Sequence, residues 1–456
     1  MTEPGIQEKW RKRDRQVLWH PFTQHRLWET EDFPVIASGH GIYLYDVEGN
    51  KYIDGVSSIW LNVHGHKKPE LDREIEEQLH RMAHSTFLGL SHPSAILLAE
   101  KLVNITPPGI SRVFYSDNGS TAMEIALKMA YQYWCQQETP EPERNKFVRL
   151  TNAYHGDTIG AVSVGGIEAF HATYYPLIFP TLAAPAPYCR HCPLPEREPD
   201  CEAGSGCLAE LERIISENRE QVAGVVIEPR VQGATGIVVQ PEGFIRGVRK
   251  LCDKYGVLMV ADEVAVGLGR TGYMFACDSE GVTPDLMAIA KGLSGGYLPM
   301  AATMTTENVF NAFLGPDHHT NTFFHGHSYT GNPLGCAASL ASLDLYEKEG
   351  VIERVKERSE QAAAWLGRIE ELPHVGEARQ AGLMMGIELE EDPESKTPYD
   401  PSLMMGRQAI MAARQKGLII RPLSDVVIIM PPLCVTEAEL DTIMRTTMES
   451  IREVTE

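Results

Sequence analysis

Two charged residues each end an apolar segment in the middle of the chain. Asp262 follows residues 257–261, and Lys291 follows residues 285–290. Such apolar runs are typical of buried strands, and the carboxyl ends of parallel strands face the crevice where open α/β sheets bind ligands. A lysine at such a place is costly to bury unless it is paired or neutralised, which makes Lys291 a candidate for a Schiff base. Asp262 is then a candidate partner for the positive charge of a cofactor.

An anion-binding site is predicted where residues 112–115, a short strand, lead into a helix that Gly119 and Ser120 begin. Apolar residues recur on one face of this helix, from Ala122 to Tyr133. The free N–H groups and the positive end of a helix dipole attract anions. An ordinary helix N-cap is the alternative interpretation of the same residues.

The segment Gly267–Gly272 matches the dinucleotide-binding pattern G-x-G-x-x-G. That pattern requires a helix after the glycines, and residues 273–285 do not continue as an amphipathic helix. A nicotinamide-dependent oxidoreductase is therefore the weaker alternative from another class. An acid at the end of an apolar strand is also typical of P-loop ATPases, but the chain contains no Gly-Lys pair, which excludes that class.

Four cysteines in a segment rich in proline and glycine could form a structural zinc site. They are Cys189, Cys192, Cys201 and Cys207, and the first two have the C-x-x-C spacing. The spacing of the second two is irregular, so free thiols in a surface loop are the alternative, and the sequence leaves both open. The histidines between residues 318 and 327 lack the spacing of metal ligands on a helix, and we expect no metal in the catalytic site.

The composition excludes several classes of function. The formal net charge of the 456 residues is −21, whereas nucleic acids and anionic membranes bind basic surfaces. No apolar run approaches the ~20 residues that a membrane span needs, and the first residues lack the apolar core of a secretory signal. The nine cysteines, mostly scattered singly, are typical of a reducing compartment. We expect a cytoplasmic enzyme that acts on small molecules.

The elements that must position these residues alternate between strand and helix from residue 112 to residue 304. This alternation predicts an α/β fold, with a mainly parallel sheet wound with helices. We expect a large cofactor-binding domain over residues 69–336. Residues 1–68, with a hairpin predicted over 42–54, and residues 337–456 have the pattern of α+β structure. We expect both chain ends to form one smaller domain.

Several motifs, in the same order along the whole chain, resemble those of the class III (ω-type) aminotransferases, which are pyridoxal-phosphate (PLP) enzymes of fold type I. The matching segments are Ser116–Ser120, Ala153–Thr158, Glu228-Pro229, Ala261–Val264, Gly267–Gly272, Ala290–Gly292 and Gly331–Leu334.

The resemblance implies roles for the residues around the cofactor ring. Lys291 would form the Schiff base with PLP, and Asp262 would pair with its pyridine nitrogen. Tyr154 would stack on one face of the ring and Val264 would pack on the other. The physical logic agrees, because a carboxylate in contact with the nitrogen raises its pKa and makes the ring an electron sink. Once released, the lysine can shuttle a proton to and from the substrate carbon.

The resemblance also implies residues for the rest of the cofactor. Gly119 and Ser120 would hold the phosphate, His155 would belong to the cofactor pocket, and Glu228 would fix the substrate side. Ser328 would reach the phosphate of the neighbouring subunit's cofactor. The resemblance therefore implies a homodimer with shared active sites.

Within the family, the chain is most similar to the members that aminate 8-amino-7-oxononanoate to 7,8-diaminononanoate in biotin synthesis, by a ping-pong reaction through a pyridoxamine form. The segments that carry this similarity are Trp19–Thr23, Ser57–Trp60, Tyr154–Thr158, Arg421-Pro422 and Met430–Pro432.

The same similarity implies three substrate contacts. Trp60 would wall the apolar substrate chain, and Arg421 would bind a substrate carboxylate as a bidentate pair. Asp157 would meet the substrate amino group or only order its loop.

Two departures bear on the amino donor. Phe22 and Ile428 stand where members that use S-adenosylmethionine carry tyrosines, so lysine or another ω-amine becomes a more plausible donor. The alternative function within the family is an ω-amino acid, diamine or taurine:pyruvate transaminase.

Overall fold

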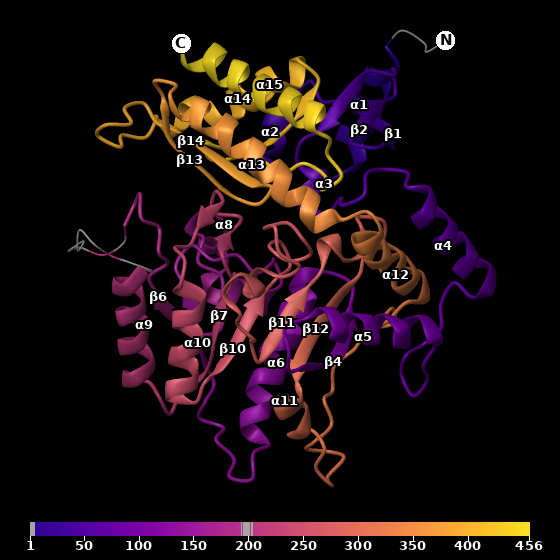
Figure 1. The fold of residues 1–456 in the computed structure, drawn as a ribbon, viewed down its shortest axis with the longest axis vertical. Coiled ribbons are helices and arrows are strands. Elements are labelled where there is room, and N and C mark those ends of the chain that lie inside the picture. Colours follow the sequence, from indigo (N-terminus) through magenta and orange to yellow (C-terminus); the bar gives the residue numbers. More distant parts are fainter. Residues whose placement is uncertain (1–4, 193, 195–200, 202–203) are drawn as a thin grey trace.

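The computed structural model describes residues 5–192, 194, 201 and 204–456. A seven-stranded sheet forms the centre of the molecule (Figure 1). Its strands, in spatial order, are β4 (Ile110–Ser116), β12 (Ala301–Thr306), β11 (Leu286–Ile289), β10 (Leu258–Asp262), β7 (Val222–Ile227), β5 (Lys146–Leu150) and β6 (Leu182–Ala184). Only β12 runs antiparallel to its neighbours within this sheet. The predicted fold class, α/β with a mainly parallel sheet wound with helices, is confirmed.

Side chains of the central strands alternate between two helical layers, as the two-residue period of a strand requires. From β10, Leu258 and Val260 pack with helix α6 (Gly119–Cys135). Met259 and Ala261 point to the opposite face, where α9 (Ser205–Glu217) and α10 (Phe244–Tyr255) cover the sheet. Because both faces are covered, every residue of β10 is buried. This double burial explains the continuous apolar run in the sequence.

The two charged strand ends lie at the same edge of the sheet. Strands β10 and β11 are parallel neighbours, with Asp262 opposite Ala288. Lys291 follows β11 after a single residue, Ala290, and has a left-handed backbone, with φ of 43°, which a non-glycine residue adopts only at a cost. The tight turn after the strand thus keeps Lys291 close to the sheet edge that carries Asp262.

Both chain ends lie together above the central sheet in Figure 1. One sheet joins β1 (Ile36–His40), β2 (Tyr43–Asp46) and β3 (Lys51–Asp54) to β15 (Leu418–Ile419). A second contains β13 (Val375–Ala381), β14 (Met384–Leu389), β17 (Val426–Ile429) and β16 (Arg421–Leu423). The larger terminal helices are α1 (Ile6–Val17), α13 (Val351–Glu370), α14 (Met405–Gln415) and α15 (Glu437–Thr455). The pairing of β3 with β15 brings the two ends together, while the domain boundaries stay a prediction.

Between these regions, α4 (Pro69–Arg81) and α5 (Pro93–Ile105) both pack on α12 (Pro333–Lys348). The predicted hairpin over residues 42–54 is confirmed. No helix in the described ranges is long and apolar enough to cross a membrane.

Residues 57–60 form one turn, α3 (Ser57–Trp60), whose four residues all have positive φ. Left-handed backbone is costly for side chains other than glycine, so other contacts must hold it. Ser58 donates from its backbone and its hydroxyl to Asp54, at 2.9 and 2.6 Å. Ser57 donates to the carbonyl of Met430, at 2.5 Å. The contact with Met430, which is far away in the sequence, explains why local sequence patterns did not predict the turn.

Candidate active site

A cavity of about 490 Å³ opens at the carboxyl edge of the central sheet. This volume is typical of sites for small molecules. The structure brings nine of the residues singled out in the sequence to its wall: Trp60, Gly119, Ser120, Tyr154, His155, Glu228, Asp262, Val264 and Lys291. They come from segments far apart in the sequence, and the fold brings these segments together at the edge of the sheet.

Lys291 is half-buried and lines the cavity. Burial lowers the pKa of its ammonium group, although Asp262 and Glu228 nearby act in the opposite direction. Its Nζ lies 5.1 Å from the centre of the Trp60 ring, within the range of a cation–π contact. A lowered pKa makes the neutral amine, which can act as a nucleophile and as a base, more accessible than in an ordinary surface lysine.

Asp262 is held by two hydrogen bonds that orient its carboxylate. The backbone N–H of Val264 donates to Oδ1 at 3.0 Å, and Nδ1 of His155 donates to Oδ2 at 2.7 Å. The side chain of His155 is fully buried. Since no lysine or arginine within the described ranges forms an ion pair with Asp262, its charge is available to a cationic group in the cavity.

Glu228 is a buried carboxyl group at the end of β7. Burial raises its pKa to about 7, against the opposing effects of His155 and of two backbone hydrogen bonds. Its oxygens accept these bonds from the N–H groups of Tyr154, at 3.0 Å, and Gly233, at 2.9 Å. Glu228 thus changes its charge near neutral pH and braces the loop that carries Tyr154.

The N-terminus of α6 has the close backbone approach that a phosphate group requires. Asn118 caps the helix by accepting a hydrogen bond from the N–H of Thr121, and Gly119 and Ser120, the first two residues of the helix, line the cavity. A Cβ on Gly119 would lie 2.6 Å from Val264, and a Cβ on Gly156 would lie 2.0 Å from the hydroxyl of Ser120. Only glycine fits at both positions. The structure shows the ordinary N-cap at Asn118, and the anion site at Gly119 and Ser120 stays a prediction.

Two of the predicted substrate residues lie beside the cavity without lining it. The Tyr154 hydroxyl donates to Asp157, at 2.7 Å, and the N–H of Asp157 donates to Ser120, at 3.1 Å. Burial raises the pKa of Tyr154, and Asp157 raises it further, so the phenol stays protonated. Asp157 thus orders its loop in this structure. Burial lowers the pKa of Arg421, with Tyr154 acting in the opposite direction.

Phe22 and Ser328 are exposed in the single chain and stand outside the cavity wall. Phe22 packs edge-to-face on Phe170, at 5.4 Å, and Phe170 packs in the same way on Tyr154, at 6.2 Å. Ser328 belongs to the loop before α12. The structure of one chain therefore does not bring these two residues to the nine that line the cavity.

The cavity also has walls that the sequence interpretation missed. They are formed by Ile59, by Asp117 and Asn118, and by the turn from Ser294 to Met300 that follows Lys291. The signal was present in Gly295-Gly296, two glycines with positive φ that let the chain turn back over the cavity.

The glycine-rich loop 267–272 serves packing rather than nucleotide binding. Arg270 in this loop is buried and donates to the backbone carbonyls of Pro431 and Asn62, at 2.5 and 3.3 Å. Irregular chain and a short 3-10 turn, Ala276–Glu280, follow the loop, so it does not open a long helix. The weaker alternative of a nicotinamide-dependent oxidoreductase loses its only motif.

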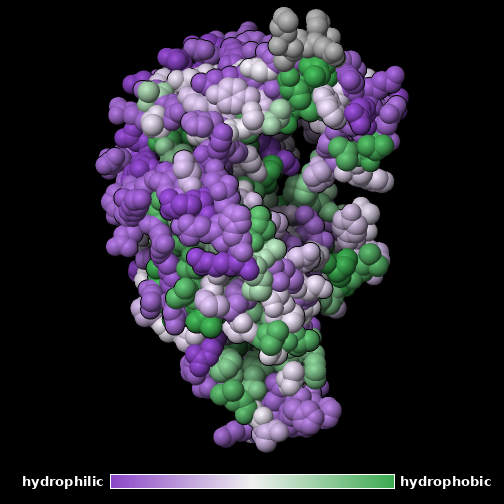
Figure 2. Space-filling view, turned by 90° about the vertical axis from the view of Figure 1, so that its right-hand side faces the viewer, coloured by the Kyte–Doolittle hydropathy of each residue, from purple (hydrophilic) through white to green (hydrophobic). Residues whose placement is uncertain are grey.

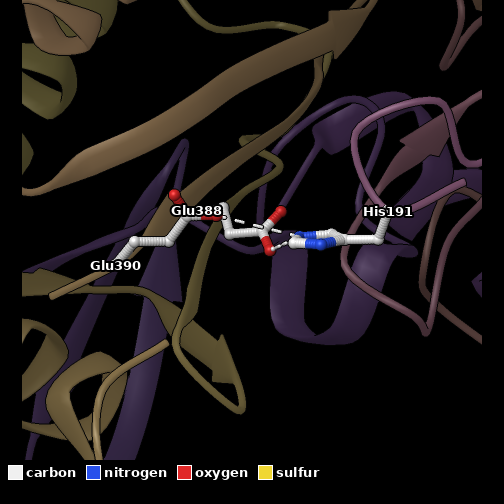
Figure 3. A group of neighbouring side chains, drawn as sticks. All are labelled: His191, Glu388 and Glu390. Carbon is white, nitrogen blue, oxygen red and sulfur yellow. Dashed lines mark hydrogen bonds and ion pairs between the residues drawn. The ribbon is translucent and has the colours of Figure 1, made fainter. Parts of the chain in front are cut away.

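One group of metal-ligand types lies close together among the described residues, where the exposed His191 meets the end of β14 (Figure 3). Its members are His191, Glu388 and Glu390, with ligand atoms within 4.8 Å of one another. Both carboxylates already have arginine partners, Arg379 and Arg190. Ion pairs therefore explain this group.

The four cysteines of the predicted zinc loop form no disulfide. Cys207 is buried in α9, whereas Cys189 is exposed and Cys192 and Cys201 are half-buried. Most of the chain between Cys192 and Cys201 lies outside the described residues. Zinc binding by these cysteines stays a prediction, and so does the alternative of a surface loop that binds no metal.

Known proteins resemble the chain over nearly its full length. Residues 27–451 match the profile of a family described as aminotransferase class-III. The adenosylmethionine-8-amino-7-oxononanoate aminotransferase of Geobacter sulfurreducens is 50% identical over 442 residues, which cover 97% of each chain. The crystal structure of the enzyme of that name from Methanocaldococcus jannaschii is 42% identical, with a TM-score of 0.92 over 98% of this chain and 99% of the other. An omega-transaminase from Thermomicrobium roseum is 32% identical, with a TM-score of 0.93 over 98% and 99%.

Proposed function

The chain belongs to the class III aminotransferases, and we propose that it transfers an amino group to 8-amino-7-oxononanoate, giving 7,8-diaminononanoate in biotin synthesis. The observation that carries this proposal is the full-length identity of 42–51% to relatives whose names state that substrate. The omega-transaminase has an equally similar fold at only 32% identity, so the fold alone does not separate the two substrates.

Like other members of its family, the enzyme uses PLP, and the residues of the cavity fit this cofactor. The N–H groups of Gly119 and Ser120 would hold its phosphate, and Asp262 would pair with its pyridine nitrogen. Tyr154 and Val264 would enclose the ring, with His155 behind Asp262. When bound, PLP supplies an electron sink for the negative charge left on a carbon that loses a proton.

The remaining steps depend on the chain's own groups. Lys291 would hold the cofactor and, as a neutral amine, take up the substrate proton at Nζ. Its lowered pKa supports this role, because a protonated ammonium group could not accept that proton. Glu228 would position the loop of Tyr154 from the substrate side. Trp60, a buried ring beside Lys291, would exclude water from the apolar part of the substrate.

Arg421 would bind the carboxylate of the substrate. It is half-buried, and burial lowers its pKa, which is a cost for a guanidinium group unless an anion pairs with it. Within the described part of the chain, no carboxylate forms an ion pair with Arg421. A substrate carboxylate would provide the missing partner, and Asp157 would meet the substrate amino group or keep its present role in ordering the loop.

We further propose that the enzyme is a homodimer whose partner completes each site. Several large hydrophobic residues are exposed, among them Trp19 and Leu88, each 89% exposed, and Phe324, 70% exposed. Figure 2 shows hydrophobic patches on a hollowed face of the molecule. Exposed patches of this kind mark interaction sites. Ser328, exposed near Phe324, would then reach the cofactor phosphate of the partner, and Phe22 would line the donor pocket. The cytoplasmic location stays a prediction.

The absorption spectrum of the purified protein tests the cofactor. We expect a yellow protein whose visible band is bleached by an amino donor and is absent in the Lys291→Ala variant. A colourless protein that PLP cannot reconstitute would contradict the proposal.

A paired assay tests the substrate. One reaction contains 8-amino-7-oxononanoate with S-adenosylmethionine or with lysine as donor, and the other contains pyruvate with a simple ω-amine. We expect turnover in the first reaction. Faster turnover with S-adenosylmethionine would agree with the names of the relatives, whereas faster turnover with lysine would agree with the loss of donor-pocket hydroxyls at Phe22 and Ile428. Turnover only in the second reaction would instead assign the chain to the ω-amine:pyruvate transaminases.

The Arg421→Ala variant tests the carboxylate contact. It should slow the reaction of carboxylate-bearing substrates and leave that of plain amines unchanged.

A further inference from the structure

A buried histidine beside the cavity has no part in the proposed function. His171 ends the short helix α8 (Glu168–His171) and is only 2% exposed. Neither of its ring nitrogens has a hydrogen-bond partner among the described residues. Burying an imidazole without hydrogen bonds is costly, and an apolar side chain would avoid that cost. The histidine therefore requires an explanation.

The surroundings of His171 are built to accept a ring at this place. A Cβ on Gly165 would lie 2.4 Å from the ring carbon Cε1, so only glycine leaves the necessary space. The ring is nearly parallel to that of Tyr154, with an angle of 11° and centroids 6.3 Å apart. His171 thus lies next to Tyr154, which itself lines the cofactor cavity.

His155, whose imidazole is close enough to lower the pKa of His171, has an unused nitrogen. Its Nδ1 donates to Asp262, but its Nε2 is buried and lacks a partner within the described ranges. The buried hydroxyl of Thr158 lacks one as well. Residues 155–171 therefore contain four such atoms, two of them on His171. A buried water molecule typically makes about three hydrogen bonds to groups of this kind.

We propose that an ordered water molecule joins His171 to Nε2 of His155, and that His171 is thereby a positioning residue for Asp262. Nε2 accepts a hydrogen bond from the water, so the proton of His155 stays on Nδ1, where it is donated to Asp262. Asp262 then remains oriented toward the pyridine nitrogen. The inference rests on the proposed function, since it requires PLP in this cavity.

The charged and titratable groups that face His171 are Asp157, Arg149, His155 and the stacked Tyr154. Burial lowers the pKa of His171, and Arg149 and His155 lower it further, whereas Asp157 raises it. The ring is therefore neutral at pH 7, with one nitrogen that donates and one that accepts. Such a ring can hold a water molecule without placing a second charge beside Asp262.

The test compares two variants of the holoenzyme. His171→Phe keeps a ring of similar shape but removes both nitrogens, and we expect PLP to bind about tenfold more weakly, the loss of one hydrogen bond to a charged network. We also expect the pH at which the cofactor band titrates to shift. His171→Gln retains a polar group that can hold the water and should recover most of the affinity.

Tyr175→Phe is the matched control, because it removes only the hydroxyl that donates to Glu168, a residue of the same helix α8 as His171. This variant should bind PLP like the wild type. If His171 only fills space, His171→Phe leaves the affinity and the titration unchanged, and this result would overturn the proposal. An equal loss in Tyr175→Phe would overturn it too. Since no substrate is present, a wrong substrate leaves the test intact, whereas a wild type that does not bind PLP contradicts the proposed function.

Discussion

Two clusters of acids and a histidine lie in this molecule, and they differ in how their charges are satisfied. At the surface cluster of Figure 3, Glu388 receives hydrogen bonds from Tyr188 and Arg379, at 2.6 and 2.5 Å. Burial raises the pKa of Glu388, but these bonds outweigh it and lower the pKa below its ordinary value. Arg190 in turn pairs with Glu390. Every charge of this cluster has a partner inside the protein.

The cluster in the cavity is built in the opposite way. Asp262, Glu228 and Lys291 lie together without an arginine partner among the described residues, and burial raises the pKa of Glu228 while it lowers that of Lys291. Such charges are costly until a ligand satisfies them. The comparison indicates that a cluster whose acids are paired with arginines is structural, whereas a cluster of buried charges without arginine partners is a binding site.

Replacing Lys291 should give the largest effect. We expect Lys291→Ala to lower turnover by about 10⁴-fold, because it removes the proton-transfer group. Steady-state assays with the accepted substrate pair measure this loss. The matched control is Lys396→Ala, at the surface cluster, where the lysine donates to the carbonyl of Arg190. Comparable losses in both variants would break the distinction between the clusters.

Breaking the surface pair should affect stability instead. Arg190→Met leaves Glu390, 2% exposed, without its arginine, and we expect a loss of about 4 kcal/mol in the free energy of unfolding. Turnover per folded molecule should not change. Replacing both partners with methionine should restore much of the stability, because no buried charge is then left unpaired. Chemical denaturation measures these differences, and lost turnover in the folded Arg190→Met enzyme would contradict the structural role.

The pH dependence of stability should have opposite signs in the two clusters. Glu228 has a folded pKa of about 7 against an ordinary value of 4.5. It therefore favours folding below pH 4.5, and this contribution is lost as the pH rises through 7, by about 3 kcal/mol in the PLP-free protein. Glu388 has a lowered pKa, so its contribution is present above pH 4.5 and is lost in acid.

Unfolding of Glu228→Gln and Glu388→Gln between pH 3 and pH 8 checks this prediction. The first variant should gain stability relative to the wild type as the pH rises, and the second should lose it. If the stability of both variants relative to the wild type changed in the same direction as the pH rises, the two clusters would not differ in how they depend on pH.

Metal ions should have the smallest effect. Because arginines neutralise Glu388 and Glu390, we expect that added zinc does not raise the melting temperature through His191. A zinc-dependent rise that disappears in His191→Ala would reveal a metal site there. A rise that persists in His191→Ala would point to the cysteine loop instead.

Much of the site could be predicted because its residues follow recognisable local patterns. Asp262 and Lys291 end apolar segments, and residues at such strand ends face one edge of a parallel sheet. Gly119 begins a helix whose period is visible in the sequence. By contrast, Ser328 and Phe22 are carried by irregular segments and stand apart from the cavity of one chain. Their predicted roles depend on a partner subunit, which no local pattern describes.

The sequence by itself determined the α/β class, the order of strands and helices, and the acid and lysine at the sheet edge, because these follow from short-range periodicity and burial. Only the tertiary structure decided the left-handed turn at Ser57–Trp60, the burial that raises the pKa of Glu228, and the meeting of His155 with Asp262. Each of these depends on contacts between residues far apart in the chain. The local sequence carries no information on such contacts, and they set the charge and geometry of the site.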